Sequence, residues 1–289
     1  MCVVVLMKWL KLSRNLTLQV EPTNACNLNC KICMRRNLER PISFLSFDNF
    51  KEILDSGNFR YVGLHGWGEP LLNKQLFDMI KYAESKGVST NLTTNGTLVQ
   101  ENIDNILSSD LREIAFGIYD EELFSRSLPQ IQKLIVERNN RHSRIPKTYL
   151  DITIYKDNLA QIPSLVKLGS EIGIEAVILH RLFNIYKVDS SAECLSEGEE
   201  VELFARVKKL ARELKLRLYL PPRHSSPCRI VKRSIFVTVK GEVTPCCYLP
   251  DFSLGNALGR GVERIMRSEA YTSFVKNMKN HPICSKCQW

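Results

Sequence analysis

The sequence predicts an α/β fold in which helices cover a parallel sheet and a small cysteine-bearing region follows. Strand-like and helix-like segments alternate from residue 15 to about residue 220, a pattern typical of a parallel sheet. The pattern changes after Pro221 and Pro222, where spaced cysteines replace it. We therefore expect an N-terminal extension over residues 1–14, a core domain over 15–220 and a C-terminal domain over 221–289.

The core domain divides into six strand and helix units. Strands are expected near residues 16–21, 60–65, 88–93, 113–118, 149–155 and 174–179. Helices are expected near residues 47–56, 74–86, 98–108, 127–139, 159–172 and 197–215. Apolar residues recur at helical spacing in two of these helices, as Leu76, Ile80 and Ala83 and as Val201, Phe204, Val207, Ala211 and Leu214. Ser196 and Glu199 have the spacing of a capping box at the start of the last helix.

Composition bounds the class of protein. The chain has 289 residues, of which 44% are hydrophobic, and no run approaches the roughly eighteen apolar residues of a membrane span. The short apolar stretch near the start is too brief for the core of a signal peptide, so we expect no export and the ten cysteines as thiols in the cytoplasm. The net charge of +9 suits acidic electron carriers, anionic substrates or RNA. Because no basic run is long, a nucleic-acid partner is not expected.

Three cysteines, Cys26, Cys30 and Cys33, stand close together in the run CNLNCKIC. A four-iron cluster normally takes four thiolates, so three on one loop would leave one iron open. A structural zinc site needs four ligands, and His65, the nearest histidine, is far along the chain, although a distant ligand could still close such a site. Disulfides explain the run less well, because the number is odd and no export signal precedes it.

The run GWGEP, from Gly66 to Pro70, follows the second expected strand. Together with the three cysteines it resembles the signature of the radical SAM superfamily, which has a GGEP-like motif there. The resemblance implies that the open iron binds S-adenosylmethionine, that Gly66 and Gly68 let the backbone approach this cofactor, and that Glu69 holds its methionine ammonium group. Trp67 departs from the pattern, since many relatives have glycine there. An isolated motif of this kind would be interpreted as an ordinary turn, but its position behind the three cysteines favours a site.

The same resemblance implies a partial (βα)6 barrel, similar to a TIM barrel, with the motifs at the carboxyl ends of its strands. Asn95, in the turn after the third strand, is then a polar contact to the cofactor or a plain turn residue. The fourth strand departs from the family, because Gly117, Ile118, Tyr119 and Asp120 stand where relatives offer a serine and an aspartate. No catalytic side chain is assigned beyond the cluster site, and Asp151 is expected to have a structural role.

A second set of cysteines follows the core domain. Cys228 and Cys246 flank an expected hairpin that turns at Gly241, and Cys284 and Cys287 are separated by two residues. The set resembles the SPASM and twitch domains of radical SAM enzymes, and the short tail favours a twitch-like domain with one auxiliary 4Fe-4S cluster. A zinc ribbon is the main alternative, because thiolate spacing cannot separate the two metals. Cys247 is an alternate ligand or a thiol outside the site, and Cys2 and Cys194 are expected as small apolar residues.

The function implied by the resemblance is reductive cleavage of S-adenosylmethionine at the first 4Fe-4S cluster to a 5'-deoxyadenosyl radical. That radical would take hydrogen from an unidentified small molecule, cofactor precursor, peptide or protein, with an oxidative or cross-linking outcome. An external one-electron donor such as ferredoxin or flavodoxin would supply the electron. Two alternatives are an iron-sulfur electron carrier and a zinc-bearing RNA-binding protein, but both leave GWGEP unexplained.

Overall fold

The computed structural model describes residues 16–183, 185, 188–222, 228 and 230–287. The expected N-terminal extension over residues 1–14 lies outside this part of the chain. The chain divides into two compact units. The first unit comprises residues 1–27, 41–92 and 224–287, and the second comprises residues 28–40, 93–223 and 288–289.

The first unit contains a sheet whose strands run in the order β10-β9-β8-β1-β2-β3. Its strands are β1 (Leu16–Val20), β2 (Phe59–Leu64), β3 (Ser89–Thr94, of which residues 89–92 belong to this unit), β8 (Ser234–Val237), β9 (Glu242–Thr244) and β10 (Gly255–Asn256). β1 pairs in parallel with β2 on one side and with β8 on the other. β8 and β9 form the expected antiparallel hairpin, and Gly241 turns it at a φ of 83°. The C-terminal cysteine region thus extends the sheet that begins with β1.

Helices complete the first unit. They are α2 (Phe47–Asp55), α3 (Leu76–Ser85), α8 (Ala257–Arg260), α9 (Val262–Met266) and α10 (Glu269–Asn277), with the short 3-10 helices η2 (Pro70–Leu72), η4 (Met278–Asn280) and η5 (Cys284–Lys286). Leu76, Ile80 and Ala83 of α3 are fully buried, which confirms the face predicted from their spacing. The Ser46 hydroxyl caps α2 by accepting a hydrogen bond from the Asn49 amide.

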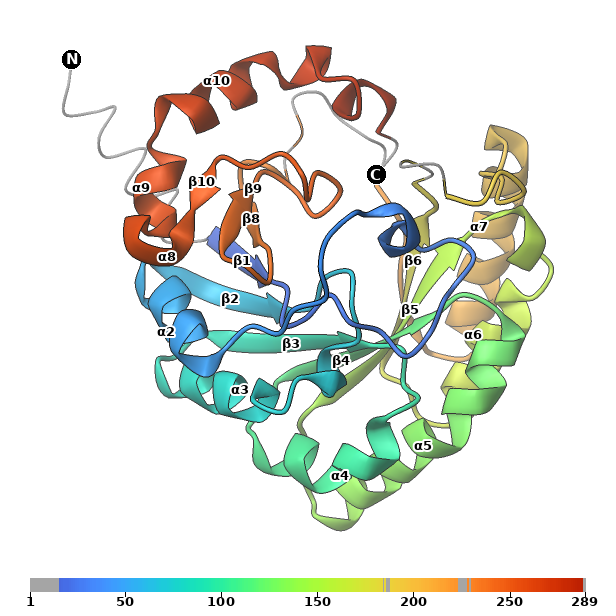
Figure 1. The fold of residues 1–289 in the computed structure, drawn as a ribbon. Helices are drawn as coiled ribbons and strands as arrows, with labels where there is room; N and C mark the ends of the chain where they lie inside the picture. The colour runs from blue at the N-terminus through green and yellow to red at the C-terminus, as the bar shows by residue number, and fades with distance from the viewer. Residues whose placement is uncertain (1–15, 184, 186–187, 223–227, 229, 288–289) are drawn as a thin grey trace, which may run out of the picture. The chain divides into compact units, whose positions relative to one another are not determined.

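The second unit contains four parallel strands in the order β4-β5-β6-β7, with α5, α6 and α7 alongside them (Figure 1). The strands are β4 (Glu113–Ile118), β5 (Lys147–Ile154), β6 (Ala176–Arg181) and β7 (Arg217–Tyr219). The helices are η1 (Met34–Asn37), α4 (Val99–Ser108), α5 (Glu121–Asn140), η3 (Lys156–Asn158), α6 (Ile162–Glu171) and α7 (Glu197–Glu213). β7 was not predicted, because this short edge strand is mostly exposed and lacks an apolar run.

Two details of the helices correct the sequence prediction. α5 begins at Glu121 rather than near residue 127, because the Asp120 carboxylate caps it by accepting the Leu123 amide at 2.8 Å. The capping box of Ser196 and Glu199 at the start of α7 is confirmed. The predicted buried face of α7 is partly wrong, since Val201 is 61% exposed. The buried residues of this helix are Leu203, Val207 and Ala211.

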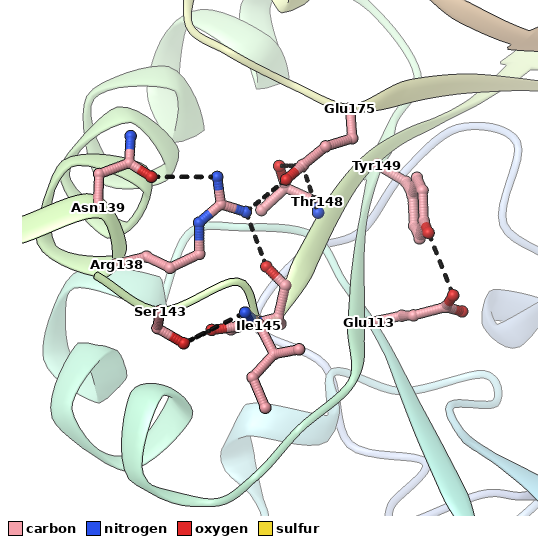
Figure 2. A network of polar contacts seen from close by, with 9 residues as sticks. Glu113, Arg138, Asn139, Ser143, Ile145, Thr148, Tyr149 and Glu175 are labelled. Atoms are coloured by element: carbon pink, nitrogen blue, oxygen red, sulfur yellow. Dashed lines mark hydrogen bonds and ion pairs between the residues drawn. The ribbon is translucent and has the colours of Figure 1, made fainter. Parts of the chain in front are cut away.

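A buried ionic network joins α5, β5 and β6 within the second unit (Figure 2). Arg138, on α5, donates from Nη1 to the Glu175 carboxylate at 2.7 Å and to the Pro146 carbonyl at 2.8 Å. Glu175 also accepts the amide of Thr148 at 2.7 Å and the Thr148 hydroxyl. Because Glu175 directly precedes β6 and Thr148 lies on β5, the network fixes the starts of both strands against the helix.

We expect Arg138→Ala to lower the free energy of unfolding by about 3 kcal/mol, because it leaves the Glu175 carboxylate without its buried cation. Urea unfolding followed by circular dichroism measures this loss. Arg141→Ala is the matched control, since Arg141 pairs with the largely exposed Asp104 and should cost less than about 1 kcal/mol. Equal losses in the two variants would contradict the role given to the network.

Candidate functional site

GWGEP and the segment that leads into the cysteine loop lie at the carboxyl ends of neighbouring strands in the first unit. β1 and β2 are parallel, with Val20 opposite Leu64, so the segments that follow them leave the sheet side by side. The Glu69 amide of GWGEP donates to the Ala25 carbonyl at 2.7 Å, and Ala25 directly precedes Cys26. The structure therefore brings GWGEP against the segment that leads into the cysteine loop.

Glycines permit this close approach. A Cβ on Gly68 would lie 2.2 Å from the Thr23 carbonyl oxygen and 2.6 Å from that of Ala25, and both are backbone atoms, which move less readily than the end of a flexible side chain. A Cβ on Gly66 would lie 2.6 Å from Cγ of Glu21. Close contacts within the protein, with backbone atoms at Gly68 and with the Glu21 side chain at Gly66, are thus a sufficient reason for both glycines. Their predicted approach to a cofactor stays a prediction.

Glu69 lies in the same contact and is only 1% exposed. Its carboxylate oxygen Oε1 accepts the Leu71 amide at 3.0 Å, which caps η2. Pro70 follows as the first residue of that short helix. The carboxylate is thereby held in a fixed orientation next to the segment that precedes Cys26.

Two buried side-chain amides, Asn24 and Asn73, also hold the segment before Cys26. The sequence analysis did not select either of them. Asn24 accepts the Ser43 amide at 2.7 Å and donates to the Pro41 carbonyl at 2.9 Å. Asn73 donates to the carbonyls of Pro22 at 2.8 Å and Leu45 at 2.9 Å. Their signal in the sequence was a polar residue beside each motif, but only the structure shows that both are buried.

The remainder of the cysteine loop belongs to the second unit. The Cys33 amide donates to the Cys30 carbonyl at 3.1 Å, and η1 follows. Lys31 forms an ion pair at 2.5 Å with Asp157, in η3 after β5. Burial, together with the nearby groups of Asp120, Asp157 and Cys30, raises the pKa of Tyr155 to about 12. Cys30 therefore lies near the carboxyl end of β5.

Polar side chains also order the turns after β3, β4 and β5 in the second unit. The Asn95 side chain accepts the amide of Thr97 at 3.0 Å and its hydroxyl at 2.7 Å, an arrangement that stabilises a turn. Asn158 donates to the carbonyls of Tyr119 at 2.8 Å and Thr153 at 2.7 Å. Asn95 thus has a local structural role, and its contact to a cofactor stays a prediction.

The four C-terminal cysteines predicted as ligands gather in the first unit. Burial, together with the smaller effects of the neighbouring thiols Cys246, Cys287 and Cys228, raises the pKa of the Cys284 thiol to about 11. The Cys284 carbonyl accepts the Cys287 amide at 3.2 Å. A hydrogen bond with the adjacent Cys247 thiol, followed by burial, raises the pKa of Cys246.

These thiols suit an iron-sulfur cluster, because its usual ligands are thiolates alone. The cysteines that the structure describes are all thiols rather than halves of disulfides. The described residues contain no group of three or more histidine, cysteine, aspartate or glutamate side chains set to hold a single metal ion. Within the described ranges, no helix is both long and apolar enough to cross a membrane.

An acidic and basic pair lies on one face of the sheet in the second unit. A Cβ on Gly169 of α6 would lie 2.5 Å from Leu150, so Leu150 faces the helices and the next residue, Asp151, faces away from them. Asp151 contacts Nε2 of His180 on β6 at 3.1 Å. Burial lowers the pKa of His180, but the charge and hydrogen bond of Asp151 outweigh it, so this pKa is raised.

Comparison with known proteins gives family matches over both parts of the chain. A model of the radical SAM superfamily matches residues 20–143. A model of the SPASM iron-sulfur cluster-binding domain matches residues 228–288.

Two curated proteins align with most of the chain. The tungsten-containing aldehyde ferredoxin oxidoreductase cofactor-modifying protein of Pyrococcus furiosus is 24% identical over 315 aligned residues, which cover 93% of this chain and 86% of that protein. The PqqA peptide cyclase of Gluconobacter oxydans is 25% identical over 263 residues, which cover 83% of this chain and 73% of the cyclase.

A solved structure shares the fold. The crystal structure of Streptococcus suis SuiB bound to S-adenosylmethionine has a TM-score of 0.75 and 16% identity, and the match covers 98% of this chain and 75% of SuiB. SuiB bound to its precursor peptide SuiA gives a TM-score of 0.72 at the same identity, over 98% of this chain and 73% of SuiB.

We expect Gly68→Ala to lower the free energy of unfolding by at least about 2 kcal/mol, because the new methyl group would overlap two carbonyl oxygens. Urea unfolding of the metal-free protein measures the effect without any contribution from a cofactor. Gly198→Ala is the matched control. Gly198 lies in α7 with open space around it, so alanine there should stabilise by about 0.5 kcal/mol. A neutral Gly68→Ala variant would show that the segment before Cys26 can move away from GWGEP.

We expect His180→Gln to destabilise the protein more at low pH than at high pH. The pKa of His180 is raised in the folded state, so its stabilising effect is full below the unfolded value and is lost as the pH rises through the folded value. Unfolding free energies of both proteins at about pH 5.5 and about pH 9 test this, since an unperturbed histidine titrates between those values. A loss of stability that is equal at both pH values, or larger at high pH, would contradict the ion pair.

Proposed function

Because this chain belongs to the radical SAM superfamily and carries a C-terminal SPASM domain, we propose that it is an oxidative maturation enzyme acting on a peptide. This membership implies S-adenosylmethionine and a 4Fe-4S cluster, and the SPASM domain implies auxiliary iron-sulfur clusters. When bound, the reduced cluster and S-adenosylmethionine supply a 5'-deoxyadenosyl radical, which takes hydrogen from an unreactive carbon. The predicted division into an N-terminal extension over residues 1–14, a core domain over 15–220 and a C-terminal domain over 221–289 is also part of this proposal.

The residues proposed to bind the cofactors are those of the two motifs. Cys26, Cys30 and Cys33 would hold the first cluster, with one iron left for S-adenosylmethionine. The observation that supports this assignment is the hydrogen bond from the Glu69 amide to the Ala25 carbonyl, which joins the backbone of the buried Glu69 to the residue that precedes Cys26. Glu69 would orient the methionine ammonium group, because a fixed carboxylate is a strong acceptor for a charged donor.

Four residues of the C-terminal region are proposed to hold one auxiliary cluster: Cys228, Cys246, Cys284 and Cys287. The mutual effect of these thiols on the pKa of Cys284 supports the assignment. Four ligands would leave no iron open to the substrate, so the cluster would store or pass electrons. Cys247, whose thiol is hydrogen-bonded to that of Cys246, is an alternate ligand or a thiol outside the site.

The proposed substrate is a ribosomally made peptide. Support comes from the similarity to PqqA peptide cyclase and from the likeness in fold to SuiB, a protein solved with its precursor peptide. A second candidate is a cofactor or its precursor, because the cofactor-modifying protein of Pyrococcus furiosus aligns with 93% of this chain. The contact of His180 with Asp151 lies on the sheet face away from the helices, where a substrate would meet polar groups.

An external reductant is needed to start the reaction. We propose an acidic one-electron carrier such as ferredoxin or flavodoxin, because the chain has a net charge of +9 and opposite charge speeds association. We also propose that the enzyme works in the cytoplasm, where its thiols stay reduced.

Anaerobic reconstitution with iron, sulfide and dithionite tests the assignment of both clusters. We expect about eight iron atoms per chain, two clusters of four, and formation of 5'-deoxyadenosine. Cys30→Ala should abolish cleavage of S-adenosylmethionine. Cys284→Ala is the matched control, because it should remove one cluster but keep some cleavage. Zinc without cleavage, or full activity of Cys30→Ala, would refute the proposal.

The substrate class can be tested by isotope transfer. Deuterated peptides and deuterated cofactor precursors would be incubated separately with the reconstituted enzyme. Deuterium found in 5'-deoxyadenosine only with the peptides would support the peptide proposal. Transfer only from a cofactor precursor would favour the second candidate.

A further inference from the structure

Trp67, between the two glycines of GWGEP, contacts the C-terminal cysteine region within the first unit. Its indole Nε1 donates to the Cys247 carbonyl at 2.8 Å, although the two residues are 180 positions apart. The indole also lies against the Tyr248 ring, with centroids 5.7 Å apart and planes tilted by 59°. The side chain is half-buried. One residue therefore belongs to the motif beside Cys26 and touches the residue next to Cys246.

The backbone of Trp67 takes part in a second connection. Its amide donates to Oε1 of Glu21 at 3.0 Å, and the Val239 amide donates to Oε2 of the same carboxylate at 3.2 Å. Glu21 is fully buried at the end of β1, and hydrogen bonds to a carboxylate are stronger than those between neutral groups. Glu21 thus joins GWGEP to the turn of the hairpin between β8 and β9.

The carbonyl that Trp67 binds is well placed to affect Cys246. The Cys246 carbonyl is itself fixed from within its own segment, by the Thr244 hydroxyl at 3.0 Å and by the Leu249 amide at 2.9 Å. The next carbonyl along the chain belongs to Cys247, and Trp67 holds it from outside that segment. The position of Cys246 therefore depends on a residue of GWGEP as well as on its own neighbours.

We propose that Trp67, supported by Glu21, is a positioning residue that couples GWGEP to the four-cysteine site. Binding of S-adenosylmethionine beside GWGEP and occupancy of the four-cysteine site would then strengthen each other, because coupling between two sites is reciprocal. The inference rests on the proposed function, since it assumes the assigned ligands. It goes beyond that function because the occupancy of the four-cysteine site would change the affinity for S-adenosylmethionine, and the reverse.

The first test is a double-mutant cycle on the dissociation constant for S-adenosylmethionine, measured by equilibrium dialysis of the reconstituted full-length protein. Four proteins are compared: the unmodified chain, Trp67→Phe, Cys284→Ala and the double variant. Trp67→Phe keeps an aromatic ring but removes the indole donor. We expect each single variant to weaken binding about fivefold, within the usual range of couplings between sites. The double variant should be no weaker than either single variant.

The outcomes of this cycle are distinct. Fold-changes that multiply in the double variant would mean independent effects and would overturn the coupling. Absence of binding by the unmodified chain would instead contradict the proposed function. Phe47→Leu is the matched control, because Phe47 makes its ring contact with Tyr82 and should leave the dissociation constant unchanged.

A second test reads the four-cysteine site directly. A chain with Cys26, Cys30 and Cys33 all changed to alanine keeps only the C-terminal set, and the release of its iron to a chelator is followed by absorbance. Adding Trp67→Phe should speed release about fivefold, within the same range, and adding Phe47→Leu should not change it. Adding Glu21→Gln should also speed release. The side chain of glutamine has one acceptor oxygen and one donor nitrogen, so it cannot replace both carboxylate oxygens that accept the Trp67 and Val239 backbone amides. Release that is unchanged by Trp67→Phe would overturn the positioning role.

Discussion

The close contact between GWGEP and the backbone of Thr23 to Ala25 determines the position of the other parts of the site in the first unit. Parallel pairing of β1 and β2 brings the two segments out of the sheet at the same edge. Gly68 then allows the carbonyls of Thr23 and Ala25 to lie where a side chain would otherwise be. Contacts between backbone atoms therefore set the positions of Glu69 and of the residues before Cys26. Backbone atoms have fewer alternative conformations than side chains.

Buried polar groups hold this arrangement from several directions. Asn24 and Asn73 bind carbonyls and amides of the chain around the cysteine loop, and Glu21 does the same toward the C-terminal hairpin. A buried amide or carboxylate is costly unless its hydrogen bonds are made, so each of these residues disfavours alternative loop conformations. The site is thus built on fixed polar contacts beside the sheet.

The sequence predicted the repeating elements well, because buried parallel strands read as apolar runs and helices as periodic ones. It also predicted an α/β fold with parallel strands, while the roles of its two sets of cysteines as cluster ligands stay a prediction. It could not predict that Trp67 meets Cys247 or that Glu21 meets Val239, since these contacts join segments far apart in the chain. Asp120 as the cap of α5 and the exposed side of Val201 were missed, because apolar spacing alone does not give the exact start or rotation of a helix.

The pairing of β8 with β1 also has a consequence for folding during synthesis. Glu21 and Val239, which meet at the end of this pair, are 218 residues apart, so the outer edge of β1 has no partner while most of the chain is being made. Uncovered strand edges are templates for unwanted pairing, and closing so long a loop slows folding. The nascent chain therefore carries an aggregation-prone edge until β8 leaves the ribosome, and premature termination before β8 would leave that edge without its partner strand.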